Sequence, residues 1–165
     1  MRICGIDNGL KGAIVLIEDG KLIEKSVMPL KESENGKKSY DPAKLVTLIS
    51  SMKPDFTFIE RATAMPKQGC VSMFNFGKVY GMTIGILEAM RLTYYIVQPK
   101  TWQKAIFEGL KITDTKDCGY QVCQKEFPNE SWLATPRCKK FHNGLTDAAC
   151  IALYGYKIKG LNSNG

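Results

Sequence analysis

Two turn dipeptides divide the start of the chain into three short strands, and this pattern constrains the fold more than any other. Residues 2–7 alternate between polar and apolar side chains and stop at an Asn-Gly pair. The apolar run 13–18 stops at an Asp-Gly pair, and residues 21–28 continue as a third strand. Because such pairs are typical of tight turns between antiparallel strands, we expect the chain to begin as a three-stranded meander.

The rest of the chain alternates helical patterns with two further apolar runs. Residues 56–60 and 94–97 have the length and composition of buried strands, while segments 31–40 and 61–71 are expected to be loops. Helices are expected from Pro42, from Asn75 to Leu92, from about Thr101, from about Thr113 to before Pro128, and from Asn143 to Tyr156. This order predicts an α/β fold with a five-stranded mixed sheet, three antiparallel strands followed by two parallel ones, flanked by helices.

The first of these helices has the clearest start signal. Asp41 is expected as its N-cap and Pro42 at its first position, where a missing backbone N–H costs nothing. Its buried face is expected to consist of Leu45, Val46, Leu48 and Ile49.

The length and composition are those of one folded domain. With 165 residues, 44% of them hydrophobic, the chain is long enough for one core and too short for two ordinary ones. We expect a single domain over residues 1–158 and a flexible tail at 159–165. The formal net charge of +7 favours a polyanionic partner such as nucleic acid, although many basic proteins bind no polyanion.

The sequence pattern predicts neither export nor a membrane partner. No apolar run approaches the roughly 20 residues that span a bilayer, and charged residues interrupt any signal-peptide core near the N-terminus. We therefore expect an intracellular, soluble protein of the cytoplasm, or of the host cytoplasm if the source is a phage or virus. The six cysteines are then expected to be reduced thiols.

One group of side chains imitates the spacing of a zinc site, namely Cys118, Cys123, Cys138 and His142. The first two lie five residues apart in an expected helix and therefore point about 140° away from each other. The group also lacks the short Cys-x-x-Cys type of pair found in structural zinc sites. We expect no zinc.

Three acidic residues stand where carboxylates can converge. Asp7 and Glu60 end the first and fourth expected strands, which the strand order places side by side and parallel, and Asp147 lies near the start of the last helix. Converging carboxylates repel one another unless cations lie between them, and oxygen ligands suit Mg²⁺ or Mn²⁺. Each acid alone also fits an ordinary turn, strand-end or helix-dipole role. Their combination favours a two-metal site for phosphodiester hydrolysis.

Five segments, in order along the chain, resemble the RuvC-type Holliday junction resolvases of the RNase H-like superfamily, especially the phage and viral branch. They are Gly-Ile-Asp-Asn-Gly-Leu at 5–10, Phe-Ile-Glu at 58–60, the helical segment 74–87, Val-Gln-Pro-Lys-Thr-Trp at 97–102, and the helix containing Asp-Ala-Ala at 144–153. Actin-like ATPases share the first motif but need two such domains. The tryptophan at 102 is expected in the core.

The resemblance implies a catalytic site with two Mg²⁺ or Mn²⁺ ions, held by Asp7, Glu60 and Asp147. The family usually has a fourth ligand, Asp or His, a few residues before the last acid, and this chain departs from that pattern. The candidates are Asn143, four residues before Asp147 on the same helix face, and His142, as a ligand or a general base. Asn143 also fits an ordinary N-cap or an inactivating Asp-to-Asn substitution.

The resemblance further implies a branched DNA partner. The loop 61–71 would probe the junction centre, with Met65 as an apolar wedge between bases. DNA contacts are expected at Arg61, Met65, Lys67, Gln68, Lys100, Lys104, Arg137, Lys139 and Lys140.

A glycine stripe on the long central helix indicates close approach by another element. Gly77, Gly81 and Gly85 recur every four residues, and each weakens the helix by about 1 kcal/mol relative to Ala. The approaching element is either the sheet of the same chain or the same helix of a second subunit, as in the dimeric resolvases that the chain resembles.

The function most consistent with these features is a metal-dependent, structure-selective DNA endonuclease that cuts four-way junctions. Two alternatives stay open. The chain could be a related nuclease acting on RNA or RNA–DNA hybrids, or a nucleic-acid-binding module that has lost catalysis, as Asn143 in place of an acid would allow.

Overall fold

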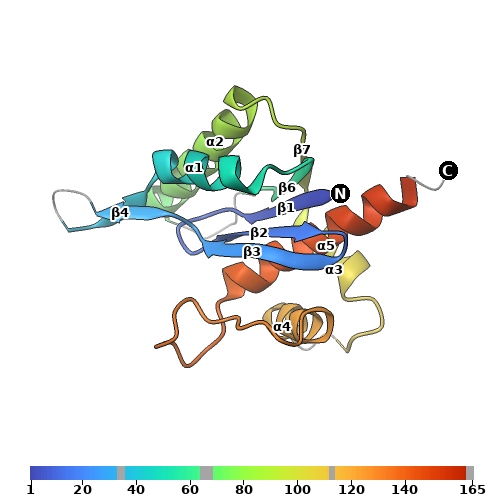
Figure 1. Ribbon diagram of the computed structural model, residues 1–165. Helices are drawn as coiled ribbons and strands as arrows, with labels where there is room; N and C mark the ends of the chain where they lie inside the picture. Colours follow the sequence, from blue (N-terminus) through green and yellow to red (C-terminus); the bar gives the residue numbers. More distant parts are fainter. Residues whose placement is uncertain (33–35, 64–68, 112–113, 163–165) are drawn as a thin grey trace.

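A five-stranded mixed sheet forms the centre of the computed structural model, which describes residues 1–32, 36–63, 69–111 and 114–162 (Figure 1). Its strand order is β3-β2-β1-β6-β7, with β1 antiparallel to β2 and parallel to β6. The strands are β1 (Arg2–Asp7), β2 (Ala13–Glu18), β3 (Lys21–Val27), β6 (Phe56–Glu60) and β7 (Tyr94–Val97). The predicted sheet, with three antiparallel strands followed by two parallel ones, is confirmed.

Helices cover both faces of this sheet (Figure 1). They are α1 (Pro42–Met52), α2 (Cys70–Ala89), α3 (Pro99–Ile106), α4 (Thr115–Glu126) and α5 (Asn143–Asn162). Because successive side chains of a strand point to opposite faces, Ile3 packs in the core beneath α3, α4 and α5, while Cys4 packs in the core beneath α1 and α2. Residues 13–17 of β2 are fully buried for the same reason.

The segment 31–40 was wrongly predicted as a loop throughout. It contributes to a small antiparallel hairpin of β4 (Leu30–Glu32) and β5 (Lys38–Tyr40), in which Leu30 pairs with Tyr40. Tyr40 is 6% exposed, and its hydroxyl lies 2.8 Å from the Thr83 hydroxyl on α2. A tertiary contact with α2 thus anchors the hairpin. Because this contact does not require alternating polar and apolar residues, the polar sequence carries no signal of the two strands.

The helices begin or end at other residues than predicted in several places. Asp41 caps α1 as predicted, by accepting a hydrogen bond from the Lys44 amide, but Val46 is 36% exposed, and the buried face includes Met52 instead. Helix α2 begins at Cys70, five residues earlier than predicted, and α5 extends through Asn162 beyond the predicted end. The flexible tail over 159–165 stays a prediction.

Helix α5 lies directly on the backbone of β1. A Cβ atom at Gly5 would collide with the carbonyl oxygen of Ala148 and lie 2.5 Å from the amide nitrogen of Ala152. Only glycine therefore permits this approach, and the two alanines facing it are fully buried. The contact leaves no layer of side chains between the helix and the strand, so residue 147 on α5 is held close to the end of β1.

Helix α2 combines a buried stripe with large exposed apolar side chains. By length and composition it is capable of crossing a membrane, with a mean hydropathy of 1.2, contrary to the expectation that no segment has this character. Val79, Thr83 and Leu87 pack into the domain, whereas Val71 and Phe74 are 76% and 72% exposed. The helix is thus part of the domain, with one face left uncovered.

Replacement of Gly5 by Ala is expected to lower the free energy of unfolding by about 3 kcal/mol or more, because the added methyl group overlaps the α5 backbone. Urea denaturation measures the change. The control is Gly160→Ala in α5, at a position where a Cβ meets nothing within 4 Å. That variant is expected to gain up to about 1 kcal/mol from helix propensity. Equal effects of the two substitutions would show that α5 does not depend on this contact.

Candidate active site

Asp7 and Glu60 lie side by side at one edge of the sheet. Strands β1 and β6 are parallel, and their register pairs Ile6 with Ile59, so the next residue of each strand is one of the two acids. The turn after β1 begins directly at Asn8, and Arg61 follows β6 with its backbone N–H bonded to the Val97 carbonyl. The predicted meeting of the two carboxylates at the carboxyl ends of parallel strands is thus consistent with the backbone.

Asp147 reaches the same edge from α5. It lies with Asp7 in the wall of a cleft of about 370 Å³, the acidic cleft, whose wall also includes Asn8, Phe76, Asn143 and Gly144. A side chain at position 144 would lie 2.5 Å from the Lys11 carbonyl oxygen, so the first turn of α5 packs closely on the loop between β1 and β2.

Glu60 belongs to an adjoining cavity of about 640 Å³, which it lines with Arg61, Gln98 and Lys100. The two cavities share Phe76 of α2, whose ring also lies 3.6 Å from the position of a Cβ at Gly9. Asp7 and Asp147 therefore line the acidic cleft, Glu60 lines the adjoining cavity, and Phe76 lines both.

The pKa of each of the three carboxyl groups is raised, chiefly by burial. Burial, and then the charges of Asp147 and Glu60, hold the pKa of Asp7 well above its usual value. The pKa of Asp147 is raised to about 7 by burial and by the charge of Glu60, against an opposing effect of Lys116. Repulsion of this kind between partly buried acids is relieved by a bound cation.

The donor set fits a hard divalent cation. Carboxylate oxygens from three different elements, with the Asn143 amide beside them, are the ligands that Mg²⁺ and Mn²⁺ prefer. Among the described residues, no three His, Cys, Asp or Glu side chains are already gathered around a common point. The acids interact electrostatically at longer range, and a cation would draw them together.

Trp102 positions Glu60, a role that sequence reasoning missed. The tryptophan is 1% exposed, as its predicted core position requires, and its indole Nε1 donates a 2.9 Å hydrogen bond to Glu60 Oε1. Burial raises the pKa of Glu60, and this hydrogen bond lowers it. The bond joins residues 42 positions apart. The spacing of Trp102 after Pro99, four residues into a new helix, was the only local signal.

His142 and Asn143, the two candidate fourth ligands, have different surroundings. His142 caps α5: its Nδ1 accepts a 3.3 Å hydrogen bond from the Leu145 amide, and burial lowers the pKa of its imidazole. Asn143 instead lines the acidic cleft with Asp7 and Asp147. The capping role therefore falls to His142, and Asn143 is the candidate that lines the cleft with Asp7 and Asp147.

Asn8 is a second residue that sequence reasoning missed. It is 6% exposed, lines the acidic cleft, and accepts a 3.0 Å hydrogen bond from Thr83, which in turn contacts Tyr40. This chain of polar contacts ties the turn after Asp7 to α2 and to the β4–β5 hairpin. The Asn8 Nδ2 atom is buried without a hydrogen-bond partner in the described part of the chain.

The predicted DNA contacts that the structure describes fall into three groups. Arg61 and Lys100 line the cavity beside Glu60, and Lys139 and Lys140 line a further cavity that includes Asn143. Lys104 and Arg137 are exposed on α3 and on the loop before α5. Met65, Lys67 and Gln68 lie outside the described residues.

The cysteines of the imitated zinc pattern have separate environments. Cys118 and Cys123 are fully buried in the core beneath α5, where Cys123 Sγ donates to the Thr146 carbonyl. Cys138 lies in the loop before α5, with its sulfur 3.3 Å from the Thr135 hydroxyl. The His142 Nδ1 is engaged in the helix cap.

The Asp147→Asn variant is expected to be more stable than the wild type near pH 8 and similar near pH 4, in the absence of metal. The folded pKa of about 7 exceeds the ordinary 3.8, so the folded protein holds this proton more tightly. The unfolding free energy of the wild type therefore falls as pH rises through this window, by about 1 to 4 kcal/mol.

Urea denaturation with a chelator, at about pH 4, 6 and 8, measures this difference. Glu108→Gln is the control, since the Glu108 side chain is 80% exposed. A gain in stability that stays constant with pH would contradict a raised pKa at Asp147.

Solved structures of the same fold are found among known proteins, although no protein-family model and no curated protein sequence matches the chain. RuvC of T. thermophilus, in complex with a Holliday junction substrate, has a TM-score of 0.67 at 15% identity, covering 98% of this chain and 96% of that one. The yeast mitochondrial Holliday junction resolvase Ydc2 has a TM-score of 0.63 at 17% identity, covering 96% and 80%. The fowlpox virus resolvase, in complex with Holliday junction DNA, has a TM-score of 0.57 at 15% identity, covering 94% and 99%. At these identities the likeness concerns the fold, and this chain has the RNase H-like fold of the RuvC-type resolvases, as its motifs predicted.

Proposed function

We propose that this protein is a metal-dependent, structure-selective DNA endonuclease that cuts four-way junctions. The observation that carries the proposal is the group of three partly buried carboxyl groups at this end of the sheet, each with a raised pKa. Burial raises all three pKa values, and the charges of neighbouring acids add to the effect at Asp7 and Asp147. Strongly raised pKa values in a cleft are typical of functional sites. The solved structures of the same fold include two resolvases in complex with Holliday junction DNA, which supports the choice of substrate.

Asp7, Glu60 and Asp147 would hold the cations, and Asn143 would contribute a neutral oxygen. When bound, two Mg²⁺ or Mn²⁺ ions supply the Lewis acidity for hydrolysis of a phosphodiester. Trp102 holds Glu60 in place through its indole N–H, so this carboxylate keeps one orientation while its second oxygen stays available. Close packing of α5 on β1 keeps Asp147 and Asp7 in the same cleft.

Basic side chains on both sides of the acids guide a DNA strand across the cleft. Arg61 and Lys100 lie beside Glu60, and Lys139 and Lys140 lie beyond Asn143. Phosphates that bind these groups release counterions, which gives affinity without base specificity. The acids would repel the same phosphates until cations neutralise them.

The exposed face of α2 joins two copies of the chain. A Cβ at Gly77, Gly81 or Gly85 meets nothing within 4 Å, so the glycine stripe does not face the sheet of its own subunit. The stripe continues into Phe74, which is 72% exposed. Small residues let two helix backbones approach closely, and a twofold arrangement would present one active site to each of two opposed DNA strands.

The Asp7→Asn and Glu60→Gln variants are expected to lose junction cleavage by at least about 100-fold while binding with near wild-type affinity. Cleavage of a synthetic four-way junction with Mg²⁺ or Mn²⁺, and gel-shift binding with Ca²⁺, measure the two properties. Glu108→Gln, a surface acid, is the control. Preferred cleavage of an RNA–DNA hybrid would favour the alternative nuclease, and wild-type binding without cleavage would favour the binding module.

The Gly81→Leu variant is expected to be a folded monomer under conditions in which the wild type is a dimer. Its side chain has room in the isolated subunit and would fill the space of the partner helix. Sedimentation velocity measures the mass, and Gly160→Leu, an equally open helical position on α5, is the control. A monomeric wild type, or dimers of both variants, would reject this interface.

A further inference from the structure

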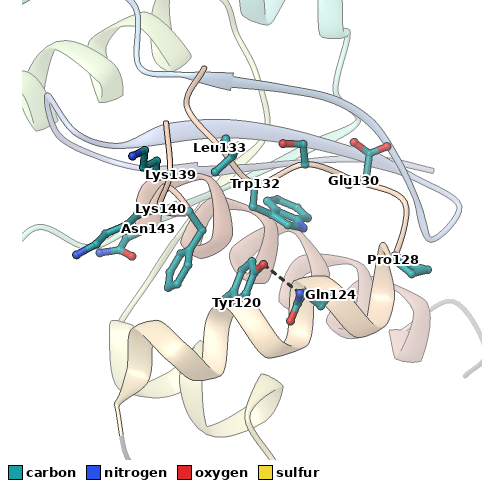
Figure 2. Close-up of a pocket in the computed structure, with 11 residues that line it drawn as sticks. Tyr120, Gln124, Pro128, Glu130, Trp132, Leu133, Lys139, Lys140 and Asn143 are labelled. Atoms are coloured by element: carbon teal, nitrogen blue, oxygen red, sulfur yellow. Dashed lines mark hydrogen bonds between the residues drawn. The ribbon is translucent and has the colours of Figure 1, made fainter. Parts of the chain in front are cut away.

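A cavity of about 770 Å³, the aromatic pocket, lies between α4 and the loop that precedes α5 (Figure 2). Its wall includes Tyr120 and Gln124 of α4, Trp132 of the loop, and Asn143 at the start of α5. This volume is in the range of pockets that enclose small organic ligands. The function proposed above uses Asn143 and the lysines Lys139 and Lys140 of this wall, and none of its aromatic residues.

The aromatic pocket opens beside the acidic cleft. Asn143 lines both of them, so a strand that passes the cleft also passes the mouth of the pocket. Figure 2 shows Lys139, Lys140 and Asn143 together at one end of the pocket, with Pro128 and Glu130 at the other. The end nearest the acids is therefore the basic end.

The two ends differ in charge for a structural reason. Glu130 is paired with Lys25, whose ammonium also lies over the Trp132 ring at 5.7 Å, so the far end is neutral. Lys139 and Lys140 are exposed and form no ion pair within the described residues. A ligand with an anionic end and a flat neutral end would enter with its charge toward these lysines.

Three aromatic side chains line part of the aromatic pocket, namely Tyr120, Trp132 and Phe141. Tyr120 and Phe141 stack face to face, with ring centroids 4.3 Å apart and an interplanar angle of 4°. Trp132 lies across the space from Tyr120 (Figure 2) and is 3% exposed, with an indole N–H that has no acceptor within the described residues. Gln124 Nε2 donates to the Tyr120 hydroxyl at 3.0 Å, which leaves the amide oxygen of Gln124 available to a ligand.

We propose that the aromatic pocket binds one unstacked nucleobase of the DNA strand that crosses the acidic cleft, with the adjoining phosphate on Lys139 and Lys140. Base stacking on aromatic side chains supplies the affinity, and the Gln124 amide contacts the edge of the base. Unstacking costs least where pairing is already interrupted, as at a branch point. The proposal rests on the proposed function, and it adds a subsite that reads the nucleotide next to the cut.

The test uses four-way junctions in which one nucleotide at a time, on either side of the scissile phosphate, is replaced by an abasic residue. With the wild type, one position is expected to lower cleavage at subsaturating enzyme by about 5- to 150-fold, the range for loss of one stacked base. In Tyr120→Ala the intact junction is expected to show a similar loss, with no further loss from the abasic residue.

Gln124→Ala provides a second variant that leaves the core untouched, because Gln124 is exposed. Its matched control is Gln121→Ala, exposed on the same helix and not in the pocket wall. Gln124→Ala is expected to change the preference among the four bases at the sensitive position, and Gln121→Ala is expected to leave it as in the wild type.

Three outcomes would overturn the proposal. If the enzyme cuts the intact junction and no abasic position lowers cleavage, the base-binding pocket is rejected and the proposed function stands. A sensitive position with the same sensitivity in Tyr120→Ala and Gln124→Ala would put the base elsewhere. A wild type that neither binds nor cuts the intact junction would reject the proposed function and this subsite with it.

Discussion

The direct contact between α5 and the backbone of β1 determines where the rest of the site lies. Gly5 has no side chain to separate the two elements, and Ala148 and Ala152 fill the contact from the helix. Asp7 is two residues beyond Gly5, and Asp147 is one residue before Ala148. Both acids therefore lie in the wall of the same cleft, at the carboxyl end of β1. A layer of ordinary side chains, several ångströms thick, would separate these carboxylates and remove the effect of the Asp147 charge on the pKa of Asp7.

Placing these acids close together disfavours their charged forms, and hydrogen bonds and charges elsewhere in the fold offset only part of this effect. Burial raises the pKa of all three acids, and repulsion by neighbouring acids raises that of Asp7 and Asp147 further. The Trp102 hydrogen bond lowers the pKa of Glu60, and Lys116 lowers that of Asp147. The folded chain therefore retains unfavourable charge in the neutral pH range. A cation site needs this arrangement, because acids that were fully neutralised by protein partners would have little affinity left for metal.

The site lies where the two helical layers meet at the end of the sheet. Phe76 comes from α2 on one side, and Asn143 and Asp147 come from α5 on the other. Asn143 joins the acidic cleft to the aromatic pocket, so one residue connects the proposed chemistry with the proposed reading of a base. The glycine stripe of α2 stays free of these contacts, which makes the surface proposed for dimerisation independent of the surface proposed for DNA.

The sequence by itself predicted the mixed sheet and the parallel pairing of β1 with β6, because turn pairs and short apolar runs are local signals. That pairing places Asp7 and Glu60 at adjacent strand ends. It also identified the fold through motifs spread along most of the chain.

Only the tertiary structure decided that 31–40 contains a hairpin, that Val46 is exposed, and that His142 caps α5 while Asn143 faces the cleft. The bonds from Trp102 to Glu60 and from Thr83 to Asn8 join residues more than 40 positions apart. Such contacts leave no periodic trace in the sequence, because each depends on how two separately formed elements pack.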